Sequence, residues 1–394
     1  MNYILFDDYS RYNLLPFTYT KPVCELRSGI LTIREKWEHE LRAEASFLTQ
    51  DYLAAKFPLK NGADSLLING KIAPDATLLA MLKDLGMNEG IRKGNDLIAW
   101  RTAQVDAFDA EAMLAKAKEV DVEYISMKDP WNFFSKNDAA IRQDFERLTN
   151  SRQSQPLSPS NTVIGDASLV FLEEGAIVEA AIINTKTGPV YIGRDAEVME
   201  GCVIRGPFCL CEHGVLKLGT KIYGATTIGP HSKVGGEVNN SVVMGYSNKA
   251  HDGFLGNSVI GEWCNLGADT NNSNLKNNYG HVKLYSYKKD QMIDTGLQFC
   301  GLMMGDHSKC GINTMFNTGT VVGVGANVFG AGFPPTHIPS FAWGGAESME
   351  EYKIDKMLET ANRVYARRGT QVSEAEEAIL RTVFTNTARY RNFQ

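Results

Sequence analysis

The chain has 394 residues, of which 43% are hydrophobic and 22% are charged. This is more than one hydrophobic core usually holds, so we expect two or three domains and a chain that is not mainly disordered. Forty Lys and Arg residues stand against 46 Asp and Glu residues, a formal net charge of −6, so we expect no nucleic-acid binding. The chain has no apolar run of membrane-spanning length, and its acidic start is unlike a signal peptide. We therefore expect no membrane association and a cytoplasmic location.

The first 150 residues alternate predicted strands with predicted helices. Apolar runs predict buried strands over residues 3–6 and 65–68, and amphipathic patterns predict helices over 31–42 and 110–118. Such alternation is typical of an α/β domain, which we expect over residues 1–150.

A polar, proline-bearing linker is expected over residues 151–160, and a strict six-residue period follows it. Such a period is too long for strand alternation and does not fit a helix, but it suits a short strand and a tight turn repeated around a coil. We expect a parallel β-solenoid over residues 161–345, with the aliphatic residue pointing inward and the next Gly or Asn adopting a positive φ. The aliphatic positions are Ile192, Val198, Ile204, Leu210, Leu216, Ile222, Ile228 and Val234, and the period returns at Met304, Cys310, Phe316, Val322 and Val328.

Two capping-box patterns lie in the last segment, residues 346–394. They are Ser348–Glu351 and Ser373–Glu376, and each predicts the start of a helix. We expect these helices to pack on the solenoid or on a neighbouring subunit.

Seven cysteines are scattered along the chain, an odd number that fits a reducing compartment better than a disulfide framework. Cys209, Cys211 and His213 alternate, so they would face one side of a strand. Zinc needs a fourth ligand, which is not evident here. Small residues on a strand are the preferred interpretation.

The period breaks within residues 239–256 and 260–274, where amides gather around one histidine. The hexapeptide pattern resembles the left-handed parallel β-helix of the hexapeptide-repeat acyltransferases. The broken stretch resembles, more specifically, the acetyltransferase core of the bifunctional N-acetylglucosamine-1-phosphate uridylyltransferase/glucosamine-1-phosphate acetyltransferase family. That family joins an N-terminal nucleotidyltransferase domain to a C-terminal left-handed β-helix. The matching residues are Ser247–His251, Phe254–Gly256, Ile260–Gly261, Asn265–Ala268 and Asn274.

The resemblance places His251 at the general base, which would deprotonate the amino group of a sugar phosphate as it attacks acetyl-CoA. An imidazole, with a reference pKa of about 6.5, suits this role. The resemblance also places Asn265 and Asn274 against the substrate, and Ala268 and Gly311 against the acetyl-CoA arm. The alternatives are that His251 is only a corner residue, or that the base is one of three other histidines, His231, His281 and His307.

Three positions depart from the family pattern. Phe254 stands where the family has its active-site tyrosine. Asn240 stands at or near the position of the family's lysine that binds the sugar phosphate, and Tyr223 stands near the position of its phosphate-binding arginine. A site without those cations would bind a sugar phosphate poorly unless others replaced them. The replacements considered are Lys249, Lys276 and Lys283, with Lys221 near Tyr223.

The first residues carry a fainter resemblance to the sugar nucleotidyltransferases. A strand, Arg11, a Leu-Pro pair and Lys21 follow in the family's order, and both cations would contact the nucleoside triphosphate. The loop has no glycine, and Lys71 replaces the Asp that would bind Mg²⁺, although its charge could neutralise a phosphate. Two readings stay open: a divergent nucleotidyltransferase that uses other acidic residues, or a domain kept for binding or regulation.

Two further segments carry open alternatives. Trp131, Asn132 and Asn137 supply sugar or metal contacts, or Trp131 packs in the core. Residues 277–294, with three tyrosines and three lysines, form a lid over an anionic ligand or a solvated loop.

The sequence thus predicts an enzyme of nucleotide-sugar biosynthesis, a transferase. It would acetylate an amino-sugar 1-phosphate in the β-helix, transfer a nucleotide to a sugar 1-phosphate in the first domain, or both. The alternatives are a single-activity nucleotidyltransferase with a trimerising β-helix and a non-catalytic regulatory homologue. The resemblance implies a homotrimer, because acyl-donor sites in that family lie between subunits.

Overall fold

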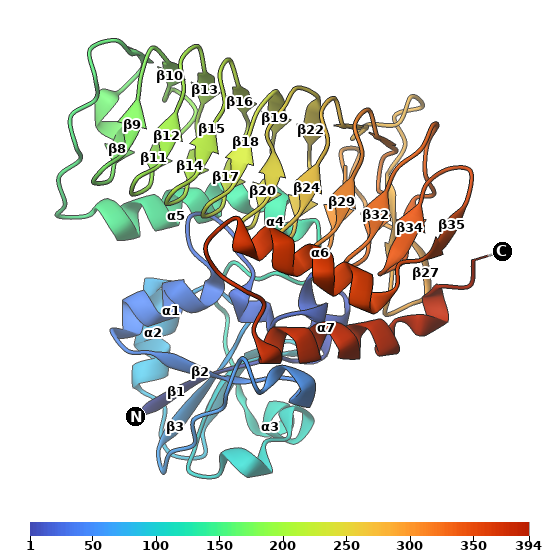
Figure 1. The fold of residues 1–394 in the computed structure, drawn as a ribbon. Coiled ribbons are helices and arrows are strands. Elements are labelled where there is room, and N and C mark those ends of the chain that lie inside the picture. The colour runs from blue at the N-terminus through green and yellow to red at the C-terminus, as the bar shows by residue number, and fades with distance from the viewer. Residues whose placement is uncertain (394) are drawn as a thin grey trace.

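The structure is a computed structural model that describes residues 1–393. It has three parts in chain order, an α/β domain, a parallel β-solenoid and C-terminal helices (Figure 1). This is the order of parts expected from the sequence. No helix among the described residues is long and apolar enough to span a membrane.

The N-terminal domain is built on one six-stranded sheet, and its predicted strands and helices are confirmed. Strand β1 runs parallel to β2 and β3, whereas β5 is antiparallel to β3 and β4. Strands β2 and β3 lie on opposite sides of β1, so the chain leaves β1 to one side and then crosses to the other. In such sheets ligands usually bind at this point, which here is where the carboxyl ends of β1 and β3 lie side by side. The strand order is β2 (Ala45–Leu48), β1 (Asn2–Phe6), β3 (Ser65–Asn69), β5 (Asp96–Thr102), β4 (Gly90–Lys93) and β6 (Lys118–Glu119), with helices α1 (Ile33–Leu41), α2 (Ala76–Lys83) and α3 (Ala110–Lys116).

The solenoid has three faces, each a sheet of short parallel strands stacked along its axis. The first face holds β7 (Thr162–Ile164), β10 (Ile182–Asn184), β13 (Val203–Arg205), β16 (Lys221–Tyr223), β19 (Glu237–Asn239) and β22 (Phe254–Gly256), and continues in β25 (Asn271–Asn272) and β30 (Met315–Phe316). The second face holds β8 (Val170–Leu172), β11 (Val190–Ile192), β14 (Phe208–Leu210), β17 (Thr226–Ile228), β20 (Val242–Val243), β23 (Val259–Ile260), β28 (Met303–Met304), β31 (Val321–Val322) and β33 (His337–Ile338). The third face holds β9 (Ile177–Val178), β12 (Glu197–Val198), β15 (Val215–Leu216), β18 (Lys233–Val234), β21 (Asn248–Lys249), β24 (Asn265–Leu266), β29 (Lys309–Cys310), β32 (Asn327–Val328), β34 (Ala342–Gly344) and the antiparallel β35 (Met349–Glu351).

The aliphatic positions of the six-residue period all point into the solenoid, as predicted, and are buried. The expectation of a positive φ directly after them is wrong. Positive φ values fall three residues after the inward residue, as at Asp195 and Gly201. The glycine that follows the inward residue serves close approach between coils, because a Cβ on Gly193 would lie 2.6 Å from the backbone nitrogen of Glu212.

The period breaks because one turn of the solenoid is shorter than the others. Between the third and first faces most turns have four residues, such as 217–220 and 267–270, but Gly235 and Gly236 alone join β18 to β19. The next inward position is therefore Val238, four residues after Val234 instead of six, and it is fully buried.

Helices α4 (Asn132–Ser135) and α5 (Asn137–Thr149) lie along the second face, between the solenoid and the N-terminal sheet (Figure 1). Asn137 is fully buried, accepts a hydrogen bond from the Gly29 amide (2.8 Å) and donates to the Ala225 carbonyl (3.1 Å). It ties the two domains together, so its predicted sugar or metal contact is wrong. Trp131 packs, half-buried, on the N-terminal core.

The C-terminal segment forms α6 (Ile354–Ala366) and α7 (Glu374–Asn386). The capping box at Ser373 is confirmed. The one at Ser348 is wrong, because Met349–Glu351 pairs as strand β35 with β34 and closes the solenoid end. Helix α6 is anchored by Tyr365, which stacks on Trp263 with ring centroids 3.8 Å apart.

Tyr365 ends a ladder of stacked rings along the corner between the second and third faces. Its solenoid members, His213, His231, Tyr246 and Trp263, each occupy the positive-φ position of successive coils, and neighbouring ring centroids are 4.3–4.7 Å apart. His307 lies at the same position farther on, 6.1 Å from the Tyr365 ring. These histidines therefore have a packing role.

The insert after β25 contains an antiparallel hairpin, β26 (Lys283–Ser286) and β27 (Gln291–Asp294). Tyr287 is buried, and its ring meets those of Tyr19 and Tyr390 edge-on at 5.5 and 5.2 Å. The hairpin is thus packed against the N-terminal domain and the C-terminal segment instead of standing free as a loop.

Glu376 makes the junction between α7 and the N-terminal domain sensitive to acid. Burial opposes its ionisation, but Lys56 at 2.7 Å and the Ser373 amide outweigh burial and lower its pKa to about 2. A carboxylate with a lowered pKa stabilises the fold above its unfolded-state value near 4.5, and this contribution is lost as the pH falls towards 2. We expect Glu376→Gln to flatten the fall in melting temperature between pH 4.5 and 2, whereas Glu374→Gln on the same helix turn keeps it. An unchanged profile in Glu376→Gln would contradict this.

Candidate functional site

His251 stands on a solenoid turn between the third and first faces, residues 250–253, which we call the His251 turn. Its side chain is exposed. In the preceding coil the turn at this corner consists only of Gly235 and Gly236. The four-residue His251 turn therefore extends outward beyond this shorter neighbouring turn. The next two turns at the corner, 267–270 and 311–314, contain Ala268 and Gly311, and the Asn313 amide donates to the Ala268 carbonyl (2.8 Å). The structure thus aligns His251 with Ala268 and Gly311 along one edge.

The other three candidate bases are less suited than His251. His231 is stacked in the ring ladder, and burial lowers its pKa. Burial lowers the pKa of His307 to about 3, so this imidazole stays uncharged. His281 lies in the insert beside Asp294, with 3.5 Å between Nδ1 and Oδ1.

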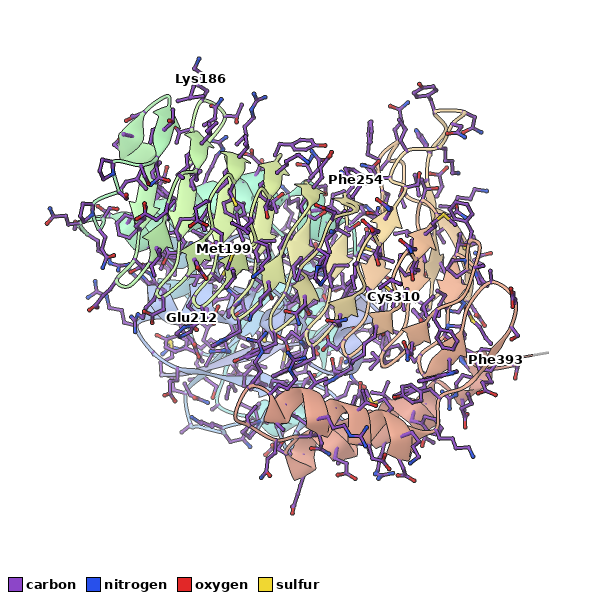
Figure 2. The ribbon with its side chains drawn as sticks, turned by 45° about the horizontal axis from the view of Figure 1, so that its top comes forward. Lys186, Met199, Glu212, Phe254, Cys310 and Phe393 are labelled. Atoms are coloured by element: carbon purple, nitrogen blue, oxygen red, sulfur yellow. The ribbon has the colours of Figure 1, made fainter. Side chains whose placement is uncertain are left out.

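Phe254 and Asn274 meet on the first face. A Cβ on Gly256 would lie within 2.7 Å of both the Phe254 ring and Asn274 Nδ2, so both side chains lie over this glycine. Phe254 lies on the side of the solenoid away from α6 and α7 (Figure 2). Asn274 also donates to Asn257 Oδ1 (2.8 Å).

A cavity of about 670 Å³ lies along the next corner, between the first and second faces. Asn240 and Asn257 line it together with Arg205, Phe299 and residues of α4 and α5. Asn240 Oδ1 already accepts a hydrogen bond from the Ala225 amide (2.9 Å). The predicted substrate residues therefore fall into two groups, one at each end of the first-face strands, and Asn265 is exposed separately on β24.

Lys249 is not available to a substrate, so its predicted role is wrong. It occupies the inward position of β21, is 3% exposed and donates to three backbone carbonyls. The sequence could have shown this, because Lys249 lies six residues before the inward Leu255.

The cations predicted to bind a nucleotide are also engaged. Lys21 Nζ is buried against the solenoid, 2.6 Å from Glu262 Oε2 and 3.0 Å from Asp306 Oδ2. Arg11 is buried, pairs with Asp7 at 3.2 Å and donates to the Thr18 carbonyl (2.6 Å). Lys21 thus joins the domains, and its predicted contact with a nucleotide is wrong.

Lys71 lies where the carboxyl ends of β1 and β3 meet. Its Nζ is 2.6 Å from Asp8 Oδ2 and 2.9 Å from Asp96 Oδ1. Burial opposes ionisation of both carboxyls. Lys71 nevertheless lowers the pKa of Asp8, and Lys128 together with Lys71 lowers the pKa of Asp96. An ammonium bound by two carboxylates is not free to neutralise a phosphate.

These residues do not fit Mg²⁺ while Lys71 is present. Mg²⁺ needs oxygen ligands around it at about 2.0–2.1 Å, and the space between the two carboxylates holds an ammonium. Among residues 1–393, no three His, Cys, Asp or Glu side chains are grouped to hold a metal ion.

Replacing Lys71 by asparagine is expected to turn this pair into a metal site. The variant should melt at a lower temperature than the wild type without metal, because Asp8 loses its counter-charge and Asp96 keeps only Lys128. Millimolar Mn²⁺ should restore its melting temperature and leave the wild type unchanged. In the control Lys71→Asn/Asp96→Asn the Mn²⁺ response should be absent. An equal response in the wild type would contradict the assignment.

A second cavity, of about 360 Å³, opens beside the carboxyl ends of β1 and β2. We call it the tyrosine cavity. Its lining includes three cations, two amides and no carboxylate, and comes from the N-terminal domain, the insert and the C-terminal segment. The lining residues are Arg11, Tyr12, Leu15, Tyr19, Gln50, Tyr52, Tyr287, Lys288, Asn386, Arg389 and Tyr390. The sequence could not have shown it, because three distant segments form it.

Comparison with known proteins agrees with this division of the chain. Residues 3–153 match a family model described as sugar nucleotidyl transferase. The match covers the first domain and does not extend into the solenoid. This match and the relatives below support the resemblance seen in the sequence.

Two of the similar proteins are named as bifunctional. A bifunctional sugar-1-phosphate nucleotidylyltransferase/acetyltransferase of Sulfurisphaera tokodaii is 30% identical over 41% of this chain and 40% of its own. A bifunctional protein GlmU of Methanocaldococcus jannaschii is 30% identical over 33% of this chain and 26% of its own. The matches thus span less than half the length of these relatives.

Solved structures add a distant likeness. The polySia-specific acetyltransferase NeuO covers 54% of this chain and 99% of its own at 14% identity, with a TM-score of 0.30. An Arabidopsis UDP-N-acetylglucosamine acyltransferase covers 60% of this chain and 91% of its own at 17% identity, with a TM-score of 0.23.

Proposed function

We propose that this protein is a transferase of nucleotide-sugar biosynthesis that acetylates the amino group of an amino-sugar 1-phosphate at the His251 turn. The observation that carries the proposal is the exposed imidazole of His251 on a turn that extends past its shortened neighbour, while His231 and His307 are held in the ring ladder. The acetyltransferase activity named for the Sulfurisphaera relative supports it.

In this reaction the imidazole accepts a proton from the acceptor nitrogen as that nitrogen attacks the thioester carbon. A C–N bond forms, the C–S bond breaks, and the proton passes to the departing thiolate. Acetyl-CoA would lie along the edge of the third-to-first-face turns. Leu218 (67% exposed) and Ile312 (70% exposed) stand on this edge two turns before and after His251, and suit an apolar pantetheine arm. Lys221 is an exposed cation two strands from Phe254 and is a candidate for the sugar phosphate.

The test is acceptor-dependent release of thiol from acetyl-CoA by the purified protein, with glucosamine 1-phosphate and a panel of amino sugars. We expect release with an amino-sugar 1-phosphate and a product 42 Da heavier than the acceptor, as an acetyl group adds roughly this mass in acyl transfer. Absence of release with every acceptor would contradict the proposal and leave the solenoid as a scaffold.

Nucleotidyl transfer in the first domain is a second candidate. The family match over residues 3–153 and the cationic, aromatic tyrosine cavity favour it. Mg²⁺ is the metal such enzymes generally use, but the Asp8–Lys71–Asp96 arrangement gives it no place. Formation of pyrophosphate from a nucleoside triphosphate and a sugar 1-phosphate tests this activity. A lack of pyrophosphate with every nucleotide would favour the regulatory alternative.

We also propose a homotrimer. Exposed apolar side chains line the first face, among them Ile164, Ile182, Val203 and Tyr223, and suit contact between subunits. Light scattering in solution should give three times the mass of the chain, and a monomer would contradict the proposal.

A further inference from the structure

One charged residue interrupts the apolar column inside the third face. From β9 to β32 the column has eight members, of which seven are aliphatic or Cys, as the lumen of a solenoid requires, and one is Lys249. The column is Val178, Val198, Leu216, Val234, Lys249, Leu266, Cys310 and Val328. An ammonium in such a place is costly unless every proton finds an acceptor.

The Lys249 ammonium finds three acceptors, all of them backbone carbonyls at the His251 turn or beside it. Nζ is 2.6 Å from the carbonyl oxygen of His251, 3.1 Å from that of Asp252 and 3.0 Å from that of Gly235. An ammonium has three N–H donors, so its capacity is filled. Two of the three bonds hold the turn that carries the imidazole, and the third ties it to the shortened turn beside it.

Neighbouring turns of the same length are held differently. In 217–220, 267–270 and 311–314 the last residue is a threonine, and its hydroxyl donates to the carbonyl of the first residue at 2.5, 2.7 and 2.9 Å. In the His251 turn that place is taken by Gly253, whose φ of +112° suits glycine alone and which has no side chain to donate. Lys249 instead donates from the lumen to the carbonyls of the second and third residues of the turn.

We propose that Lys249 is a positioning residue, which holds the carbonyls of the His251 turn from inside the solenoid and so fixes where the His251 imidazole stands. The proposal rests on the proposed acetyl transfer, because only that reaction gives the placement a catalytic consequence.

The bonds to the turn depend on the charge of Lys249. Burial lowers its pKa to about 8, while Asp252, Asp269 and Cys310, the titratable groups around it, act in the opposite sense. Above this pH the neutral amine keeps two N–H donors for three carbonyls. The His251 turn should therefore loosen as the pH rises from 7 to 9.

Lys249→Met keeps the length of the side chain and removes its donors. Because it also removes a buried charge, we expect a melting temperature equal to or above that of the wild type. The amides of Glu237 and Asp269, which donate to the carbonyls of Gly253 and Asp252 (3.2 and 3.1 Å), should exchange with solvent about tenfold faster, the value for one lost net hydrogen bond at 1.4 kcal/mol per factor of ten. The NMR signal of the His251 imidazole, identified by its loss in His251→Ala, should shift. The kcat for acetyl transfer should fall with little change in KM for acetyl-CoA.

The matched control is Leu266→Met, at the inward position of the next coil, which should leave exchange, NMR signal and kcat unchanged. In the wild type, exchange at the Glu237 and Asp269 amides, corrected for intrinsic rates, should rise between pH 7 and 9, and in Lys249→Met it should not. This comparison within the wild type keeps the proposal testable if the variant folds poorly.

The positioning role would be overturned if Lys249→Met showed the amide exchange rates and the His251 NMR signal of the wild type. It would also be overturned if the exchange rates of the wild type did not change between pH 7 and 9. If the wild type releases no thiol, acetyl transfer fails, and exchange and NMR still decide whether Lys249 places the imidazole.

Discussion

His251→Ala is expected to lower acceptor-dependent thiol release by about 10²–10⁴-fold, the usual contribution of a general base. The loss should fall on kcat, because the imidazole accepts its proton only as the bond to carbon forms, and KM for acetyl-CoA should change little. Steady-state assays with saturating amino-sugar 1-phosphate measure both constants.

The control is His281→Ala, which removes an exposed histidine from the insert and should keep full activity. A His251→Ala enzyme within twofold of the wild type would place the base elsewhere on the chain. Loss of activity together with unfolding, detected by circular dichroism, would leave the variant uninformative, and His251→Gln would then replace it.

Lys21→Met is expected to lower the free energy of unfolding by roughly 3–5 kcal/mol, the cost of leaving one partner of a buried ion pair alone. The partner left alone is Asp306, which is 3% exposed and otherwise receives hydrogen bonds from Thr20 Oγ1 (2.6 Å) and the Glu262 amide (2.8 Å). Because Lys21 and Asp306 belong to different domains, the loss should also loosen the contact between the N-terminal sheet and the solenoid.

Denaturant unfolding measures the loss, and limited proteolysis should cut the domain junction sooner. Lys60→Met is the matched control. Lys60 pairs with Glu44 at 3.2 Å on the surface, where such a pair is worth about 0–1 kcal/mol. Equal losses in the two variants would contradict a buried role for Lys21.

The candidate site was only partly readable from the sequence. His251, Ala268 and Gly311 lie along one edge because the solenoid repeats and the turns of successive coils stack. The amides Asn240 and Asn274 lie near the opposite corner, because the length of a first-face strand separates the corners at its two ends. A motif gives the order of residues along the chain but not the face on which each side chain emerges.

Charged residues gave the clearest errors. Arg11, Lys21, Lys71 and Lys249 look like binding residues in the sequence because cations bind phosphates. Lys21 and Lys71 are instead paired inside the fold by Asp306 and Asp8, which reach them only after distant segments have come together. Arg11 pairs with Asp7 four residues away, and Lys249 binds carbonyls of the turn that follows it. The sequence gives a side chain's charge and leaves its partner open.

The sequence by itself determined the solenoid, the aliphatic inward residues of its regular coils, and two strands and two helices of the first domain. Hydrophobic periodicity is a local property, and burial of an aliphatic residue every six positions leaves one arrangement of coils. Only the tertiary structure decided the function of the glycines between coils, the partners of the buried lysines and the tyrosine cavity. These depend on contacts between coils, between strands of the first domain, or between the domains and the C-terminal segment, and no local pattern specifies such contacts.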